Sequence, residues 1–217
     1  MPVVSWLFLG GKCRYCKKPI GWLTFSLEAL AGLVAVLLYL FWPYGFSDPL
    51  TIALFVVWIV ALAPLFILLA YDRRWGYLPD VVMWPLIALG VVIFVLTQLV
   101  LQTEPQQSIL GLMYSLAPAA GFYGLLYVAS RGKWIGLGDV KFGIFMGLVL
   151  DWQLCLLAVF LANLLACIAI LPAYYRGKLR SDSHVAFGPF LIIATLIAFM
   201  WGHQLIDWYL SFSGISL

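Results

Sequence analysis

Seven long apolar runs, separated by short loops, constrain the fold of this 217-residue chain more than any other feature. A helix needs about 20 consecutive apolar residues to cross a bilayer, and all but one of the runs reach that length. With 65% hydrophobic and only 10% charged residues, the chain is neither a soluble globular domain nor a disordered one. We therefore predict an all-α polytopic membrane protein with about seven transmembrane helices. The predicted spans are 23–42, 51–71, 81–101, 108–130, the shorter 136–150, 154–175 and 187–210.

The positions of the twelve Lys and Arg residues predict the orientation of these spans. Basic residues accumulate in the cytoplasmic loops of membrane proteins. Loops 43–50, 102–107 and 151–153 and the C-terminal tail contain none of them. This asymmetry predicts a cytoplasmic N-terminus and an outside C-terminus, which an odd number of spans allows. The basic residues are Lys12, Arg14, Lys17, Lys18, Arg73, Arg74, Arg131, Lys133, Lys141, Arg176, Lys178 and Arg180.

Three carboxylates are predicted to lie at the cytoplasmic boundary of the membrane. Asp80 follows Pro79 at the start of a span, where a helix-capping role explains it without any function. Asp72 ends a span, a position that the helix dipole disfavours for an anion, although Arg73 and Arg74 offset that cost. Ionisable residues at membrane depth usually mark function, so Asp72 is a candidate site residue.

The third carboxylate, Asp139, opens the short fifth run. Gly136 and Gly138 flank its approach, and their missing side chains suit the close entry of another segment beside the carboxylate. Lys141 adds a second ionisable group two residues later. A helix-start interpretation remains open for Asp139 too, because a carboxylate in a first helical turn is favourable.

Asp72 and Asp139 together would suit aspartyl proteolysis. Two neighbouring carboxylates share a proton, so one can activate water while the other polarises the scissile carbonyl. The chain has only two histidines, His184 and His203, and no serine-hydrolase, zincin or nucleotide-binding motif. The alternative from another class is a proton- or ion-coupled transporter or an assembly subunit that uses the same carboxylates. That alternative would favour charges near the bilayer midplane and repeated halves, neither of which the sequence indicates.

Four stretches of the chain resemble the bacterial type IV prepilin peptidases, which are membrane aspartyl proteases with a Gly-x-Gly-Asp motif. They occur in the same order as in that family and extend over nearly the whole chain. The stretches are Ser5–Ile20 with Glu28, then Tyr71-Asp72 with Tyr77-Leu78-Pro79-Asp80, then Gly136-Leu137-Gly138-Asp139-Val140-Lys141, and finally Ala186–Leu191 with Trp201-Gly202 and Asp207-Trp208-Tyr209.

This resemblance implies an activity and its site. Asp72 and Asp139 would be the catalytic acids, with Gly136, Gly138, Lys141 and Asp80 supporting them or lining the approach of the substrate. The substrates would be type IV prepilins or pseudopilins, cleaved on the cytoplasmic side of the bacterial inner membrane, with the bilayer as a partner and no nucleic acid. The resemblance also implies methylation of the new N-terminus, for which S-adenosylmethionine would be the methyl donor. Proteolysis itself would need no cofactor.

The N-terminal segment departs from the family pattern. An earlier span and a first Cys-x-x-Cys pair are missing, so we expect an N-terminally short form. We divide the chain into a cytoplasmic basic segment, 1–22, and a membrane peptidase domain, 23–217. Cys13 and Cys16 supply only two of the four ligands that a structural zinc site needs, so stoichiometric zinc is not expected. Cys155 and Cys167 lie in a predicted span and are interpreted as packing residues.

Overall fold

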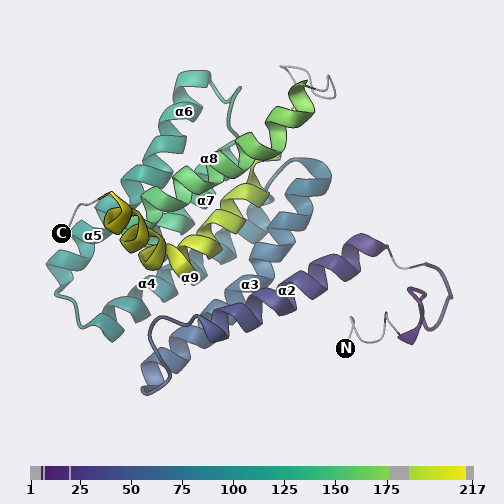
Figure 1. Ribbon diagram of the computed structural model, residues 1–217, viewed down its shortest axis with the longest axis horizontal. Coiled ribbons are helices and arrows are strands. Elements are labelled where there is room, and N and C mark those ends of the chain that lie inside the picture. The colour runs from purple at the N-terminus through teal and green to yellow at the C-terminus, as the bar shows by residue number, and fades with distance from the viewer. Residues whose placement is uncertain (1–5, 7, 20, 176–185, 214–217) are drawn as a thin grey trace. The chain divides into compact units, whose positions relative to one another are not determined.

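A computed structural model describes residues 6, 8–19, 21–175 and 186–213 of the chain. The chain forms two compact units, Met1–Trp42 and Pro43–Leu217, and each is described by itself. Figure 1 shows that helices dominate both units. The division that the sequence analysis places after residue 22 remains a prediction.

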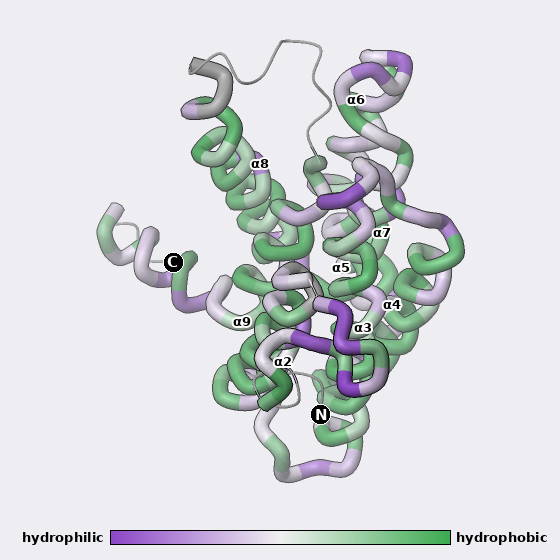
Figure 2. Tube along the Cα trace, turned by 90° about the vertical axis from the view of Figure 1, so that its right-hand side faces the viewer, coloured by the Kyte–Doolittle hydropathy of each residue, from purple (hydrophilic) through white to green (hydrophobic). Residues whose placement is uncertain are grey.

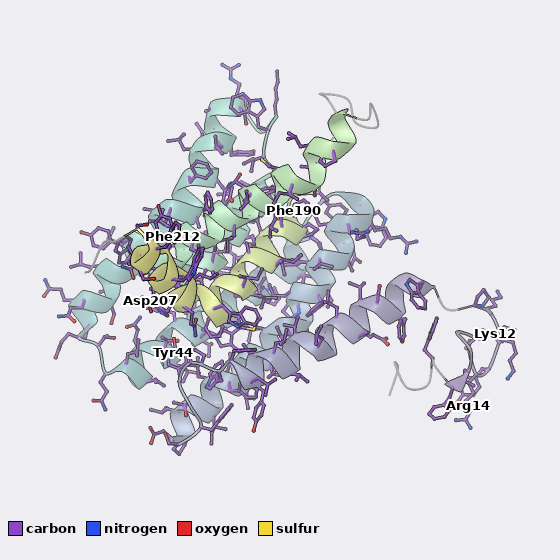
Figure 3. All side chains as sticks on the ribbon, in the orientation of Figure 1. Lys12, Arg14, Tyr44, Phe190, Asp207 and Phe212 are labelled. Carbon is purple, nitrogen blue, oxygen red and sulfur yellow. The ribbon has the colours of Figure 1, made fainter. Side chains whose placement is uncertain are left out.

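The first unit consists of a basic loop and helix α2 (Trp22–Leu40). The loop closes on itself through a bridge between Lys12 and Pro19 and a hydrogen bond from the N–H of Cys13 to the carbonyl of Lys18, 2.9 Å long. Figure 3 shows Lys12 and Arg14 projecting from this loop. Where the loop meets α2, the rings of Trp6 and Phe25 stack with centroids 4.4 Å apart. Aromatic rings beside a basic segment are typical of a membrane–water interface.

The second unit is a bundle of helices joined by short loops. Helices α3, α4, α8 and α9 are each long and mostly apolar, whereas α7 is a single short helix. A π-helix, η1, interrupts the segment that α5 begins and α6 completes, and it contains Pro118. The helices are α3 (Pro49–Trp75), α4 (Asp80–Leu101), α5 (Pro105–Leu116), η1 (Ala117–Gly121), α6 (Phe122–Ser130), α7 (Leu137–Val149), α8 (Trp152–Tyr175) and α9 (Gly188–Phe212).

Helix α7 is the most enclosed element of the second unit, because it packs against α4, α5 and η1. Two of its glycines permit this packing. A Cβ on Gly143 would lie 2.9 Å from the backbone nitrogen of Ala120, and one on Gly147 would lie 2.8 Å from the side chain of Leu116. Real Cβ atoms do not approach other atoms this closely, so α7 and its neighbour meet at a distance that only glycine allows.

The predicted apolar runs all form helices in the described part of the chain. Five helical segments there are long and apolar enough to cross a membrane, and Phe25–Leu40 is a shorter apolar helix. Figure 2 shows the hydrophobic colour along the helices and the hydrophilic colour at their ends and in the loops. Large apolar side chains such as Val56, Val95 and Phe160 are exposed, as expected where lipid covers a helix. The protein is therefore an all-α polytopic membrane protein.

Candidate active site

Asp72 lies in the last full turn of α3, and the residue is only 5% exposed. Its Oδ2 atom accepts a hydrogen bond of 2.8 Å from the backbone N–H of Gly188, the first residue of α9. Helix α3 then ends at Gly76, which has a φ of +68° that favours glycine. The sequence placed Asp72 at the unfavourable end of its own helix. The contact with α9 shows how the fold compensates, because the carboxylate lies at the favourable N-terminal end of another helix.

Asp139 lies in the first turn of α7 and is half-buried. Its Oδ2 atom accepts a hydrogen bond of 3.2 Å from the N–H of Gly136, and its own N–H donates to the carbonyl of Gly136. Asp139 thus holds the start of α7 as the helix-start interpretation expects. This role does not exclude chemistry, because within the described residues no hydrogen bond reaches its other carboxylate oxygen.

The structure brings the two acids into one region. The charges of Asp72 and Asp139 interact electrostatically, although α3 and α7 are far apart in the sequence. Leu78, which is buried, packs beside a glycine next to each acid: a Cβ on Gly188 would lie 3.2 Å from its Cδ2 atom, and a Cβ on Gly138 would lie 2.9 Å from its Cβ atom. Leu78 therefore joins the end of α3 to the starts of α7 and α9.

The two glycines before Asp139 differ in their surroundings. Gly138 is closely enclosed by the side chain of Leu78, whereas a Cβ on Gly136 would meet only Asp139 Oδ2, at an ordinary distance of 3.5 Å. Of these two glycines, only Gly138 has another segment packed closely against it, and the contact is made by the side chain of Leu78. Gly136 serves instead as the N-terminal cap that bonds Asp139.

Asp80 and Lys141 form an ion pair beside the acids. The Nζ atom of Lys141 lies 2.6 Å from Oδ1 of Asp80, with side-chain exposures of 17% and 59%. Lys141 also lies over the ring of Trp84, 5.6 Å from its centroid. The pair joins the start of α4 to the first turns of α7, and Asp80 is the first residue of its helix, as the capping interpretation expects.

Tyr123, which lies near Asp139, and its partner Asn163 were not among the predicted site residues. Tyr123 of α6 is fully buried, and its hydroxyl accepts a hydrogen bond of 3.3 Å from Nδ2 of Asn163 in α8. Its ring makes an edge contact with Phe187, 5.7 Å between centroids, and it interacts electrostatically with Asp139. Asn163 is the single asparagine of the chain and falls within an apolar run, a signal from which the contact could have been anticipated.

The cysteine pair is separate from the acids and belongs to the first unit. Hydrogen bonds from the backbone N–H groups of Cys16 and Tyr15 hold the pKa of the Cys13 thiol below its usual value. Within the described residues, no group of three or more Cys, His, Asp or Glu side chains could hold a metal ion. The two thiols alone do not make a tetrahedral zinc site. Cys155 is buried and Cys167 exposed, and both are free thiols, whereas His184 lies outside the described residues.

Known proteins show similarity along the whole chain. The profile of the Type IV leader peptidase family matches residues 59–171, and that of the bacterial peptidase A24 N-terminal domain matches residues 1–42. Proteins described as prepilin leader peptidase/N-methyltransferase are similar too. That of Pseudomonas aeruginosa is 29% identical over 99% of this chain and 70% of its own length. That of Legionella pneumophila is 28% identical over 98% and 70%. No solved structure matches.

The first family match spans more than half of the chain and includes both acids, and the second includes both cysteines of the basic loop. The relatives that it resembles are enzymes that process prepilins, and the resemblance extends over both units. The chain is a membrane-bound peptidase that belongs to the type IV leader peptidase family.

Proposed function

We propose that this protein is an aspartyl endopeptidase that removes the leader from type IV prepilins or pseudopilins, with Asp72 and Asp139 as its catalytic acids. The single observation that carries the proposal is the electrostatic interaction of these two carboxylates, one at the end of α3 and one at the start of α7. Each has one oxygen held by a glycine N–H, at 2.8 Å and 3.2 Å. The acids are thus held in position, and within the described residues no hydrogen bond reaches their Oδ1 atoms.

The chemistry needs nothing beyond the acid pair and water. One carboxylate takes a proton from water as the water oxygen attacks the scissile carbonyl carbon, and the other donates its proton to the carbonyl oxygen. When the tetrahedral intermediate collapses, the C–N bond breaks and the leaving amine takes up a proton from the pair. Backbone N–H groups that hold the carboxylates supply the preorganisation that such a reaction requires.

We infer the side of the membrane from the positions of the charges. The basic residues and both acids lie in, or at helix ends next to, the loops that the positive-inside rule assigns to the cytoplasm, so we propose cleavage at the cytoplasmic face of the bacterial inner membrane. A reporter that is active only outside the membrane should give a signal when fused at residue 104 or 151 and none at 74, 132 or 178. A cytoplasmic signal for the C-terminus would contradict this orientation.

Methyl transfer is a separate activity in this proposal. Carboxylates can hydrolyse an amide but carry no methyl group, so N-methylation of the product would require S-adenosylmethionine. The test of both activities is one experiment: the purified chain is incubated with a candidate prepilin, with and without S-adenosylmethionine, and the product is analysed by mass spectrometry. Loss of the leader in both samples supports the peptidase, and an added methyl mass in one supports the transferase. An uncleaved prepilin across a panel of candidates would contradict the proposal.

A further inference from the structure

The start of α9 lies against Asp72 of the proposed site. Gly188 is the first residue of this helix, and its N–H donates to Oδ2 of Asp72 over 2.8 Å, although 116 positions separate the two residues. Both residues are buried. Figure 3 labels Phe190, in the first turn of the same helix, and Phe212 at its far end. The first turn of α9 therefore contacts an acid of the proposed site directly.

The first turn has only one backbone donor to give to Asp72. Pro189, the second residue of the helix, has no N–H. The N–H groups of Phe190 and Leu191 both donate to the carbonyl of Phe187, at 3.0 Å and 3.3 Å. Gly188 is thus the donor that remains, and the sequence Phe-Gly-Pro at this point leaves it aimed at the carboxylate.

Gly188 has no space for a side chain. A Cβ at this position would lie 2.7 Å from Oδ2 and 3.1 Å from Cγ of Asp72, and 3.2 Å from Cδ2 of Leu78. Contacts below 3.0 Å essentially never occur for real Cβ atoms, so the carboxylate would have to move. Any residue other than glycine would therefore displace the group that the N–H holds.

We propose that Gly188 is a positioning residue of the acid pair. Its N–H holds Oδ2 of Asp72, and its missing side chain lets the carboxylate lie against the start of α9, with Oδ1 left for water and for Asp139. Gly136 gives the same kind of bond to Asp139 at the start of α7. Each acid is then held by a glycine N–H at the start of a helix. The inference rests on the proposed peptidase function and adds to it the group that orients one acid.

The test compares two glycine variants in prepilin cleavage by the full chain. Gly188→Ala should lower kcat by about 100-fold, since a displacement of about 1 Å in a catalytic group has an effect of that size. KM should change by less than about twofold, because the substrate contacts are unaffected. Gly111→Ala, in α5, is the control, since a Cβ there meets nothing within 4 Å. Equal activity of Gly188→Ala and the control would overturn the inference.

A second variant distinguishes the contact of the new Cβ with Asp72 from its contact with Leu78. Leu78→Ala removes the Cδ2 atom that a new Cβ would touch and leaves the contact with Asp72. Adding Gly188→Ala to the Leu78→Ala variant should therefore lower kcat by the same factor as adding it to the native chain. If that cost disappears, packing against Leu78 explains the effect and the inference is wrong.

A double-mutant cycle on the melting temperature keeps the test valid even if Gly188→Ala folds poorly. In an Asp72→Ala background, the oxygen and the Cγ that the new Cβ would meet are absent. Gly188→Ala should then lower the melting temperature much less than it does with Asp72 present. An equal loss in both backgrounds would overturn the inference. Asp72→Asn in the same cleavage assay tests the peptidase proposal itself: if that variant is active, the proposed function fails, whatever Gly188 does.

Discussion

Each of the two units carries a pair of reactive side chains, and the pairs are built in opposite ways. Cys13 and Cys16 lie in one short loop, and local backbone hydrogen bonds hold them. Asp72 and Asp139 come from different helices, a third helix bonds Asp72, and Leu78 packs against the glycines beside both acids. The cysteine pair is thus a product of local sequence, whereas the acid pair depends on tertiary structure.

The difference also concerns what each pair can do by itself. A zinc site needs four ligands, so two thiols from one loop remain half of a site. An aspartyl protease needs two carboxylates, so the proposed acid pair has the number of groups that its chemistry requires. A variant that disturbs the packing of the second unit should therefore impair catalysis, while changes at the cysteines should not. The following predictions test this contrast, in decreasing order of expected effect.

Asp72→Asn and Asp139→Asn should each reduce leader cleavage by about 10²- to 10⁴-fold, because an amide cannot exchange the shared proton. Both variants should still accumulate in the membrane, since Asn is nearly isosteric with Asp. Cleavage is measured by the mobility shift of a coexpressed prepilin. The control is Asp80→Asn, which should retain substantial activity. If Asp80→Asn is inactive and Asp72→Asn is active, the first acid has been assigned to the wrong residue.

Gly138→Ala tests whether the acid pair depends on the contact between α7 and Leu78. The new Cβ would lie 2.9 Å from Cβ of Leu78, an atom next to the backbone that cannot rotate away. Overpacking of this kind costs about 1–3 kcal/mol, so the melting temperature and the cleavage rate should both fall. Gly124→Ala in α6 is the matched control, since its Cβ would lie 3.7 Å from Val140. Equal behaviour of the two variants would mean that α7 adjusts without disturbing Asp139.

The ion pair between Asp80 and Lys141 should contribute less than either acid. A partly exposed pair is worth up to about 1 kcal/mol, so Asp80→Lys should lower the free energy of unfolding by about that amount, or somewhat more through repulsion. Exchange of the charges, Asp80→Lys with Lys141→Asp, should restore part of the loss. Recovery should be incomplete because the contact of Lys141 with Trp84 is gone. No recovery in a thermal unfolding series would show that the attraction between these charges is unimportant.

The smallest effect is expected at the cysteines. Cys13→Ser together with Cys16→Ser should leave prepilin cleavage unchanged, because the proposed water activation uses only the two acids. The native chain should carry less than about half an equivalent of zinc, since a two-ligand site holds the metal weakly. Metal analysis of the purified protein checks this. A full equivalent of zinc that disappears in the double variant would mean that further ligands complete the site.

The sequence was informative about helices and about the acids as candidates. The fifth run, 136–150, differs from α7 by one residue at each end, and α3 extends a few residues beyond its predicted span at both ends. This success reflects the length and continuity of the apolar runs. The π-helix was not predicted, because Pro118 in an apolar run gives no distinct signal of a widened turn.

The partners of the acids could not be predicted from the sequence. In a membrane protein, the faces that meet lipid and those that meet other helices are both apolar, so hydropathy does not indicate which residues pack together. The contact of Asp72 with Gly188 joins residues 116 positions apart and involves a backbone group, which leaves no mark in composition. The contact of Tyr123 with Asn163 was more accessible, because a lone amide in an apolar run needs a partner.

The π-helix between α5 and α6 changes the direction in which the side chains after it point around the helix axis. A π-turn is equivalent to one extra residue inserted into an α-helix, and each residue of an α-helix advances the direction of the side chains by about 100°. Every side chain after Gly121 therefore points about 100° away from where an uninterrupted helix would direct it. Tyr123, two residues beyond the insertion, meets Asn163 and Phe187 in this shifted phase. Deletion of one residue within 117–121 would restore a regular helix and keep Tyr123 in this direction, whereas a regular helix over the full sequence would turn Tyr123 away from both partners.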